Sequence, residues 1–370
     1  MKFTPLGSRI DLVARTPGPQ WRMLAENVPV WPTKPPLPKS TWADHARYAP
    51  SQGLAPLLAA LCNRELGRGV TLTAEFLLVT NGGFDGLGLV ARHLAAKGIR
   101  RAICGGPILL SVADLFEAVG LEVLVTDFPT LADKQTLISL DVGANDLVYL
   151  NTPHNPTGAC LNEKDVRAIL NAHREIGFSL VMDMVYDSFV HDPAACKSPL
   201  ALVIDWDKVY ALNSFSKNYG APGLRVGWLI AAPREIERLA GRLEWERIAV
   251  STEAQHIAAY LCSHGNTALI KRVQTGRELV LDWAKELGVS VLPSQGGTHI
   301  WVDLLVGDTE LFADKLMSEH SIVLNTGANY CPVSNNYIRI PCGADPDVLF
   351  GSLQTIAVVH REIFEASGSR

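Results

Sequence analysis

Six short runs of residues that are apolar almost throughout recur along the middle of the chain. They are EFLLVT (75–80), LEVLVTDF (121–128), DLVYLN (146–151), FSLVMD (178–183), KVYALNS (208–214) and GWLIAA (227–232). Runs that do not alternate between apolar and polar residues are typical of strands that are covered on both faces. With helical patterns between them, these runs predict a doubly wound α/β fold around a mostly parallel sheet.

The helical patterns support this interpretation, and the pattern changes near residue 270. In the segment after Asn162, apolar positions from Val166 to Leu170 share one helical face, and Asn162 is a suitable N-cap. Beyond residue 270, short strands such as THIWVDL and YIRIP alternate with helices. We therefore expect a large domain over 45–270. Residues 1–44 and 271–370 should form an N-terminal arm and a smaller α+β domain.

Composition and the N-terminal segment narrow the range of functions. The first forty residues contain eight prolines, which predicts an extended arm rather than a long helix. The net charge of −5 gives no reason to expect nucleic acid or an acidic membrane surface as partner. Seven scattered cysteines without C-x-x-C spacing indicate neither a metal site nor a disulfide framework. Without a signal-peptide-like or membrane-spanning run, we expect a cytoplasmic protein that acts on small molecules.

Polar residues follow the predicted strands at the point where each strand ends. Asn155 follows DLVYLN, Asp183 ends FSLVMD, and Lys217 follows KVYALNS. Ligands in α/β sheets bind at the carboxyl ends of the strands, so these side chains should meet at one edge. The Gly82-Gly83 turn before a helical pattern predicts backbone N–H groups that can bind a phosphate. Asp183 needs a partner in a buried strand, and a structural role for it is as open as a catalytic one.

Taken together, these motifs resemble those of the fold-type I pyridoxal-phosphate enzymes, and specifically the class I/II aminotransferases. NSFSKNYGAPGLRVGW (213–228) is similar to the family's cofactor-lysine signature, S-x-S-K followed by G-x-R-x-G. NTPHNPTG (151–158) and DMVYDSF (183–189) also match, and VTNGGFDGL (79–87) and YAPSQGLAPL (48–57) match more loosely. The motifs stand in the family's order, from about residue 48 to 340. The resemblance implies an aspartate-aminotransferase-like fold and pyridoxal 5′-phosphate as cofactor.

The resemblance also implies a role for each matching residue. Lys217 would form the Schiff base with the cofactor aldehyde and shuttle a proton. Asp183 would hold the pyridine nitrogen protonated, and Tyr186 and Asn155 would bind the ring's phenolic oxygen. Arg339, in YIRIP, matches the arginine that binds the substrate α-carboxylate. The phosphate would be bound by Ser214, Ser216, Arg225, the backbone of Gly83 and Phe84, and Tyr48 of a neighbouring subunit, which implies a homodimer with shared active sites.

Three positions depart from the family pattern. Ile108 or Leu109 stands where an aromatic residue usually stacks on the cofactor ring, and Phe84 replaces a small hydroxyl residue at the phosphate. In the arm, LVARTPGP places Arg15 near a usual glycine. Either its side chain reaches the substrate, or the alignment slips by a few residues. His299 is better interpreted as a core or surface histidine than as part of the pocket.

The leading hypothesis is an aminotransferase that transfers the amino group of an amino acid to a 2-oxo acid. A rival hypothesis keeps the cofactor and changes the reaction to β- or γ-elimination or replacement, decarboxylation, cyclisation or oxidation. The departure at Leu109 leaves that alternative open. A third hypothesis, a non-catalytic ligand-binding domain, is disfavoured by the complete set of matching residues.

Overall fold

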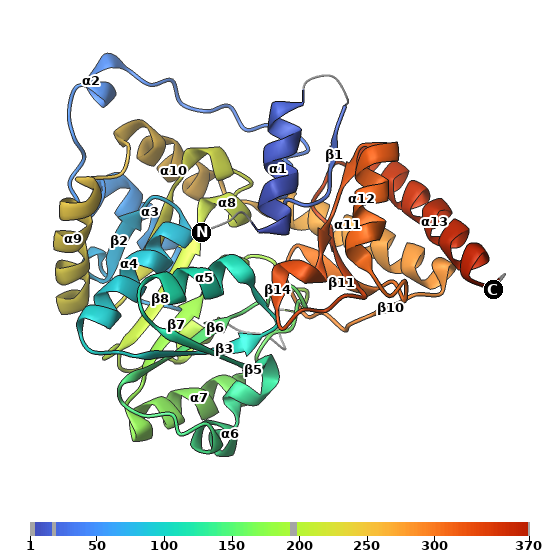
Figure 1. The fold of residues 1–370 in the computed structure, drawn as a ribbon. Coiled ribbons are helices and arrows are strands. Elements are labelled where there is room, and N and C mark those ends of the chain that lie inside the picture. Colours follow the sequence, from blue (N-terminus) through green and yellow to red (C-terminus); the bar gives the residue numbers. More distant parts are fainter. Residues whose placement is uncertain (1–3, 17–19, 193–197, 369–370) are drawn as a thin grey trace.

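The computed structural model describes residues 4–16, 20–192 and 198–368. Its largest element is a sheet of seven strands (Figure 1). In spatial order these are β2 (Leu77–Thr80), β9 (Gly227–Ile230), β8 (Val209–Ser214), β7 (Ser179–Asp183), β6 (Asp146–Asn151), β3 (Arg101–Gly106) and β5 (Glu122–Asp127). The five strands from β8 to β5 pair in parallel, and β9 is antiparallel to both β8 and β2. The predicted mostly parallel α/β sheet is confirmed.

Helices cover both faces of this sheet, which explains the unbroken apolar runs. On one face lie α3 (Ala55–Leu66), α7 (Glu163–Ile176) and α10 (Thr252–His264); on the other lie α4 (Gly83–Ala96), α5 (Leu110–Ala118) and α9 (Pro233–Arg247). Neighbouring strand residues alternate between the two cores: Leu147 packs with α4, and Val148 packs with α7. The Asn162 side chain caps α7 through the Asp165 N–H, as predicted. Strand β5 is at the sheet edge and is only partly covered, unlike the prediction for 121–128.

A second unit contains a four-stranded sheet with long helices beside it. Its strands are β10 (Ser290–Val291), β11 (His299–Asp303), β15 (Tyr337–Pro341) and β13 (Asn325–Thr326), and its helices are α11 (Thr267–Leu287), α12 (Thr309–His320) and α13 (Pro346–Gly368). The strand β1 (Arg22–Met23) of the arm pairs in parallel with β12 (Ile322–Val323). The two units are connected by β4 (Ile108–Leu109), which pairs with β14 (Tyr330–Cys331). The predicted domain boundaries at residues 45 and 270 stay a prediction.

The short elements complete the chain. They are α2 (Trp42–His45), α6 (Lys134–Ser139), α8 (Phe215–Asn218) and the 3₁₀ turns η1 (Ala74–Phe76), η2 (Phe128–Ala132), η3 (Pro199–Leu202), η4 (Pro222–Leu224) and η5 (Gly327–Asn329). Two of them, α8 and η4, follow β8 directly and form the loop that the cofactor-lysine signature occupies.

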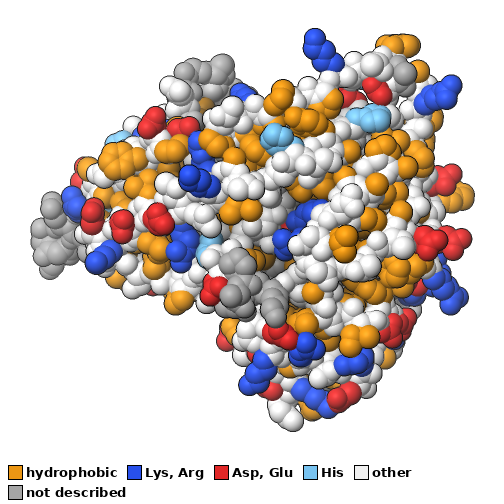
Figure 2. Space-filling view, turned by 180° about the vertical axis from the view of Figure 1, so that it is seen from behind, with side chains coloured by type: hydrophobic (Ala, Val, Ile, Leu, Met, Phe, Trp, Pro, Cys, Tyr) orange, Lys and Arg blue, Asp and Glu red, His pale blue; other side chains and the backbone are white. Residues whose placement is uncertain are grey.

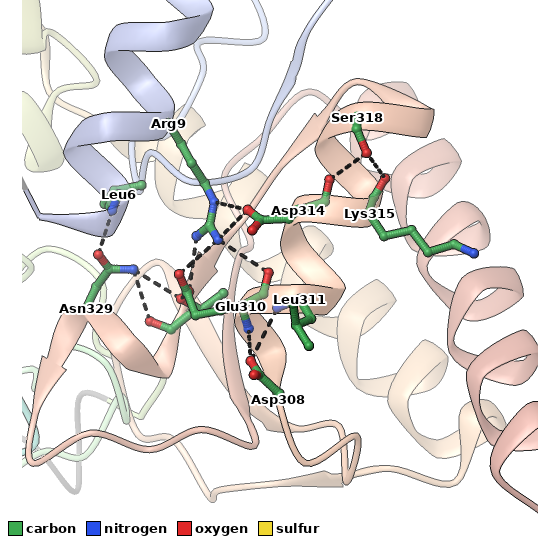
Figure 3. Close-up of polar contacts among 10 residues, drawn as sticks. Leu6, Arg9, Asp308, Glu310, Leu311, Asp314, Lys315, Ser318 and Asn329 are labelled. Atoms are coloured by element: carbon green, nitrogen blue, oxygen red, sulfur yellow. Dashed lines mark hydrogen bonds and ion pairs between the residues drawn. The ribbon is translucent and has the colours of Figure 1, made fainter.

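The N-terminal arm is not extended throughout, and in this respect the prediction is wrong. Residues Pro5–Arg15 form the helix α1, with Pro5 in its first turn and Thr4 as a side-chain cap. Proline is compatible with the first helical turn because its missing N–H would have no helical partner there. The next prolines, in 17–19, lie outside the described residues. Arg9 ties α1 to the second unit through Glu310 and Asp314 of α12 (Figure 3).

The surface is mixed in character. The face in Figure 2 carries acidic and basic side chains distributed among apolar ones. Within the described residues, no helix has the length and apolar character needed to cross a membrane. Cys62, Cys104, Cys262, Cys331 and Cys342 are free thiols, and Cys196 lies outside the described residues.

Candidate active site

The carboxyl ends of the parallel strands open into a cavity of about 260 Å³. Ten of the predicted site residues line it: Gly83, Phe84, Leu109, Asn155, Asp183, Tyr186, Ser214, Ser216, Lys217 and Arg225. Tyr149, which the sequence analysis did not select, lines it as well. The strand ends therefore bring together the polar residues that the topology rule predicted.

Lys217 lies on α8, one short turn after β8 ends. Within the described residues, no hydrogen bond or ion pair to its Nζ is seen. Burial, with the charges of Arg339 and Arg225, lowers the pKa of Lys217 to about 8, although Glu26 acts to raise it. At neutral pH an appreciable fraction of this lysine is therefore the neutral amine, which is the nucleophilic form.

Asp183 ends β7 and points into the same cavity. Its carboxylate accepts a hydrogen bond of 2.7 Å from the Tyr149 hydroxyl and one of 3.2 Å from the Val185 N–H. Burial raises the pKa of Asp183 to about 6, and these two hydrogen bonds act in the opposite direction. A buried carboxylate with so few partners is suited to a cationic group of a ligand.

The opposite end of the cavity is suited to an anion. The helix α4 begins at Gly83, after Gly82 with a φ of +93°. A Cβ at position 82 would lie 2.5 Å from Arg225 Nη2, so only glycine lets the guanidinium approach this turn. Arg225 donates to the carbonyls of Asn81 and Pro222, with Ser216 Oγ 3.5 Å away. A guanidinium, two serine hydroxyls and a helix N-terminus thus face one region of the cavity.

Arg339, on β15, is not among the residues that line the cavity, but it contacts Asn155, which is. It is buried and donates 2.9 Å to Asn155 Oδ1, 3.0 Å to the Tyr330 hydroxyl and 2.7 Å to the Ala25 carbonyl. The Tyr330 hydroxyl in turn donates to Asn155 Oδ1 at 3.2 Å. Arg339 Nε has no hydrogen-bond partner in the described part of the chain. This buried N–H is a donor that a bound carboxylate can use.

Arg15 is not among the residues that line the cavity, and its predicted substrate contact stays a prediction. It lies in the last turn of α1, where its side chain is 73% exposed and pairs with Asp11. The arm contacts the residues around the site further along the chain, at Ala25 and Asn27.

The remaining predicted residues vary in their placement. His299 is a core residue: it is buried against the Tyr186 ring at a centroid distance of 5.3 Å, and its Nδ1 lies 2.5 Å from the Asn27 amide nitrogen. Leu109 lines the cavity, and its backbone pairs with Tyr330. Phe84 lines the cavity while remaining 47% exposed. Tyr48 is 81% exposed and is not among the residues that line the cavity.

Comparison with known proteins identifies the family. The family model "Aminotransferase class I and II" matches residues 39–349. The chain belongs to the class I and II aminotransferases. It is an aminotransferase, and its family uses pyridoxal 5′-phosphate.

Two relatives of this aminotransferase have informative names. It is 56% identical over 364 residues, 98% of each chain, to the 3-methylarginine biosynthesis aminotransferase ArgM of Streptomyces arginensis. It is 37% identical to the L-aspartate:5-guanidino-3-methyl-2-oxopentanoate transaminase of Pseudomonas syringae pv. syringae, over 90% of this chain and 87% of the relative. The aspartate aminotransferase structure of Thermotoga maritima matches with a TM-score of 0.80 and 20% identity, over 95% of this chain and 94% of that chain. This likeness shows the aspartate-aminotransferase-like fold.

Proposed function

We propose that this aminotransferase transfers the amino group of L-aspartate to 5-guanidino-3-methyl-2-oxopentanoate, which yields a 3-methylarginine. The names of the two relatives support this choice of donor and acceptor. Support also comes from the extent of the similarity, since the alignment with ArgM spans nearly the whole of both chains. With this donor and acceptor, the protein is a transferase of amino-acid metabolism. The proposal disfavours the elimination, decarboxylation, cyclisation and oxidation reactions that the same cofactor can perform.

The residues of the cavity are suited to pyridoxal 5′-phosphate. Asp183 would pair with the ring nitrogen, and Tyr186 and Asn155 would bind the phenolic oxygen. The phosphate would lie against Ser214, Ser216, Arg225 and the N–H groups of Gly83 and Phe84. The close approach of the Arg225 guanidinium to the Gly82 turn, where a Cβ would lie 2.5 Å from Nη2, supports this assignment. When bound, the cofactor supplies an aldehyde for the Lys217 amine and a protonated ring that draws electrons from the substrate α-carbon.

The chain's own residues would then position the substrate and move one proton. Arg339 would bind the substrate α-carboxylate, with Asn155 and Tyr330 fixing its guanidinium. Lys217 Nζ would take the proton from the substrate α-carbon and later return one. A pKa of about 8 suits this exchange, because a base near neutral pH can both accept and release a proton. The meeting of Lys217 and the buried Asp183 in one cavity is the observation that carries this mechanism.

The aminotransferase would work as a homodimer in the cytoplasm. Tyr48 carries a large, exposed side chain away from its own cavity, and we propose that it binds the phosphate in a neighbouring subunit. The free thiols of Cys62, Cys104, Cys262, Cys331 and Cys342 agree with a reducing compartment. Sedimentation of the purified protein tests the dimer. A monomeric protein would contradict the proposal. The affinity for the cofactor tests the shared site, because Tyr48→Phe should weaken cofactor binding.

The cofactor spectrum tests the reaction itself. Purified enzyme loaded with pyridoxal 5′-phosphate should change to the spectrum of the amino form when L-aspartate is added. Adding 5-guanidino-3-methyl-2-oxopentanoate should reverse the change and produce 3-methylarginine, which mass spectrometry detects. Lys217→Ala should show neither step. Release of ammonia or carbon dioxide without reversal would contradict transamination.

A further inference from the structure

One acidic side chain, Glu26, lies next to the residues that hold Arg339. The preceding residue, Ala25, accepts a hydrogen bond of 2.7 Å from Arg339 Nη2 through its carbonyl. The following residue, Asn27, contacts His299 Nδ1 at 2.5 Å and accepts a hydrogen bond of 2.8 Å from the Thr298 hydroxyl. Both neighbours are buried at 1% exposure, whereas Glu26 is exposed. The backbone at Glu26 is therefore fixed on both sides, and its carboxylate remains accessible to a ligand.

Glu26 is one residue away from a hydrogen-bond network that leads to the cavity. The Ala25 carbonyl accepts from Arg339, and Arg339 donates to Asn155, which lines the cavity. The Glu26 charge also acts on the reacting amine: it raises the pKa of Lys217, whereas burial and the charges of Arg339 and Arg225 lower it. Asp183, which lines the cavity, is the carboxylate that we assign to the cofactor's ring nitrogen.

The charges around the site bear on which substrate side chains it can accept. The three cations Lys217, Arg225 and Arg339 would repel a positively charged substrate side chain. A carboxylate next to the Ala25–Arg339 contact would offset that repulsion, and it could bind a guanidinium through two parallel hydrogen bonds. A substrate that is anionic at its α-carboxylate and cationic at its far end would be bound at both ends by Arg339 and Glu26.

We propose that Glu26 is the residue that selects a guanidinium side chain on the substrate. This inference rests on the proposed function and assigns its side-chain specificity to one residue. The short side chain of the donor, L-aspartate, does not require this contact, so the two half-reactions should depend on Glu26 differently.

Substrate kinetics of Glu26→Gln test the proposal, because this variant keeps the shape and removes the charge. We expect kcat/KM for the guanidino oxo acid to fall about tenfold to thirtyfold, as for loss of one charged contact. The half-reaction with L-aspartate and turnover of a neutral straight-chain oxo acid, 2-oxohexanoate, should change less than about twofold. Glu117→Gln, which removes an exposed carboxylate from α5, is the matched control and should leave all three values unchanged.

Binding measurements give a readout without turnover. The protein should bind 5-guanidinopentanoate more tightly than heptanoate, which has a carboxylate but no cation. That preference should disappear in Glu26→Gln, as measured by calorimetry.

Failures of the two proposals can be told apart. If the wild type uses the guanidino oxo acid, and Glu26→Gln lowers kcat/KM equally for charged and neutral substrates, the inference is overturned and the proposed function stands. If the wild type reacts with L-aspartate but does not use the guanidino oxo acid, the proposed function is overturned and the inference with it.

Discussion

The hydroxyl of Tyr149 lies 2.7 Å from a carboxylate oxygen of Asp183, across two neighbouring strands of the central sheet. Tyr149 is on β6 and Asp183 ends β7, so the register of two buried strands fixes the contact. The Tyr149 ring packs edge-on against Phe116 at 5.5 Å, which prevents it from turning away. The Asp183 carboxylate thus has a hydrogen-bond partner, Tyr149, whose position is fixed by the pairing of β6 with β7.

Removing this hydroxyl should change the acid behaviour of Asp183. The hydrogen bond from Tyr149 lowers the pKa of Asp183 against the effect of burial, so Tyr149→Phe should raise that pKa further above about 6. Binding of pyridoxal 5′-phosphate, which needs the charged carboxylate, should then weaken at a higher pH than in the wild type. A hydrogen bond to a charged group contributes about 1.5 kcal/mol, or about tenfold in affinity.

The test is a pH series of cofactor affinity in cofactor-free protein. Tyr210→Phe provides the control, since the Tyr210 hydroxyl donates 2.9 Å to Glu235 outside the cavity. If cofactor affinity falls at the same acidic pH in Tyr149→Phe as in the wild type, this hydroxyl does not lower the pKa of Asp183.

Tyr330→Phe should weaken substrate binding more than turnover. The Tyr330 hydroxyl contacts both Arg339 and Asn155, so its loss frees the guanidinium that we assign to the substrate carboxylate. One hydrogen bond is worth about 1 kcal/mol, which predicts a KM raised about fivefold with kcat nearly unchanged. Steady-state kinetics measure this split. Tyr337→Phe is the control, because its ring stacks on the same Trp301, whereas Arg339 donates to Asn155, Tyr330 and Ala25. A fall in kcat alone would contradict the assignment.

Lys217→Met should make the cofactor-free protein more stable at neutral pH. The folded-state pKa of Lys217, about 8, is below its ordinary value of 10.5, so the unfolded chain binds more protons between these values. The free energy of unfolding therefore rises as the pH goes from about 8 to 10.5. Below pH 8, the buried lysine lowers the free energy of unfolding by on the order of 2–3 kcal/mol.

Guanidinium-induced unfolding at about pH 7 and about pH 10 measures the difference. The advantage of Lys217→Met over the wild type should be large at the lower pH and should shrink at the higher one. Lys271→Met, at an exposed position of α11, should show no such dependence. An advantage of equal size at both pH values would mean that lost packing or other causes outweigh the titration.

Arg9→Met should loosen α1 from the second unit without removing activity. The Arg9 side chain is 8% exposed and lies 2.9 Å from Glu310 and 2.8 Å from Asp314, whose side chains are 31% and 64% exposed (Figure 3). Because both partners reach solvent, we expect a loss of about 1–2 kcal/mol, less than for a fully buried ion pair. Arg15→Met, on the exposed side of the same helix, should change stability little, and thermal unfolding compares the two.

The sequence predicted the parts of this site that local pattern determines. Unbroken apolar runs locate buried strands, and the residue that ends a parallel strand lies at the binding edge, so Asp183 and Lys217 were correctly placed in one cavity. The glycine turn was predictable for a related reason, because φ at Gly82 is positive.

The parts that were missed depend on contacts between distant segments. Tyr149 and Tyr330 stand among apolar residues and have the pattern of core aromatic residues; their hydroxyl partners lie on other strands. The position of Arg15 outside the cavity lining was not foreseen either, because the arm's position is set by its pairing with β12, which no local pattern encodes. The helix α1 was not predicted because the number of prolines was considered and not their positions. Pro5 lies in the first turn of α1, where proline is tolerated.

The bond from Arg339 to the Ala25 carbonyl has a consequence for the order of folding during synthesis. Its two residues are 314 positions apart, and Arg22 of the same arm pairs with Ile322. The central sheet is complete once β9 has left the ribosome, but the arm has to wait for strands made near the end of translation. Until then Ala25 and Asn27 lack their native partners, so a nascent chain could contain a finished cofactor cavity before it has any means of recognising a substrate.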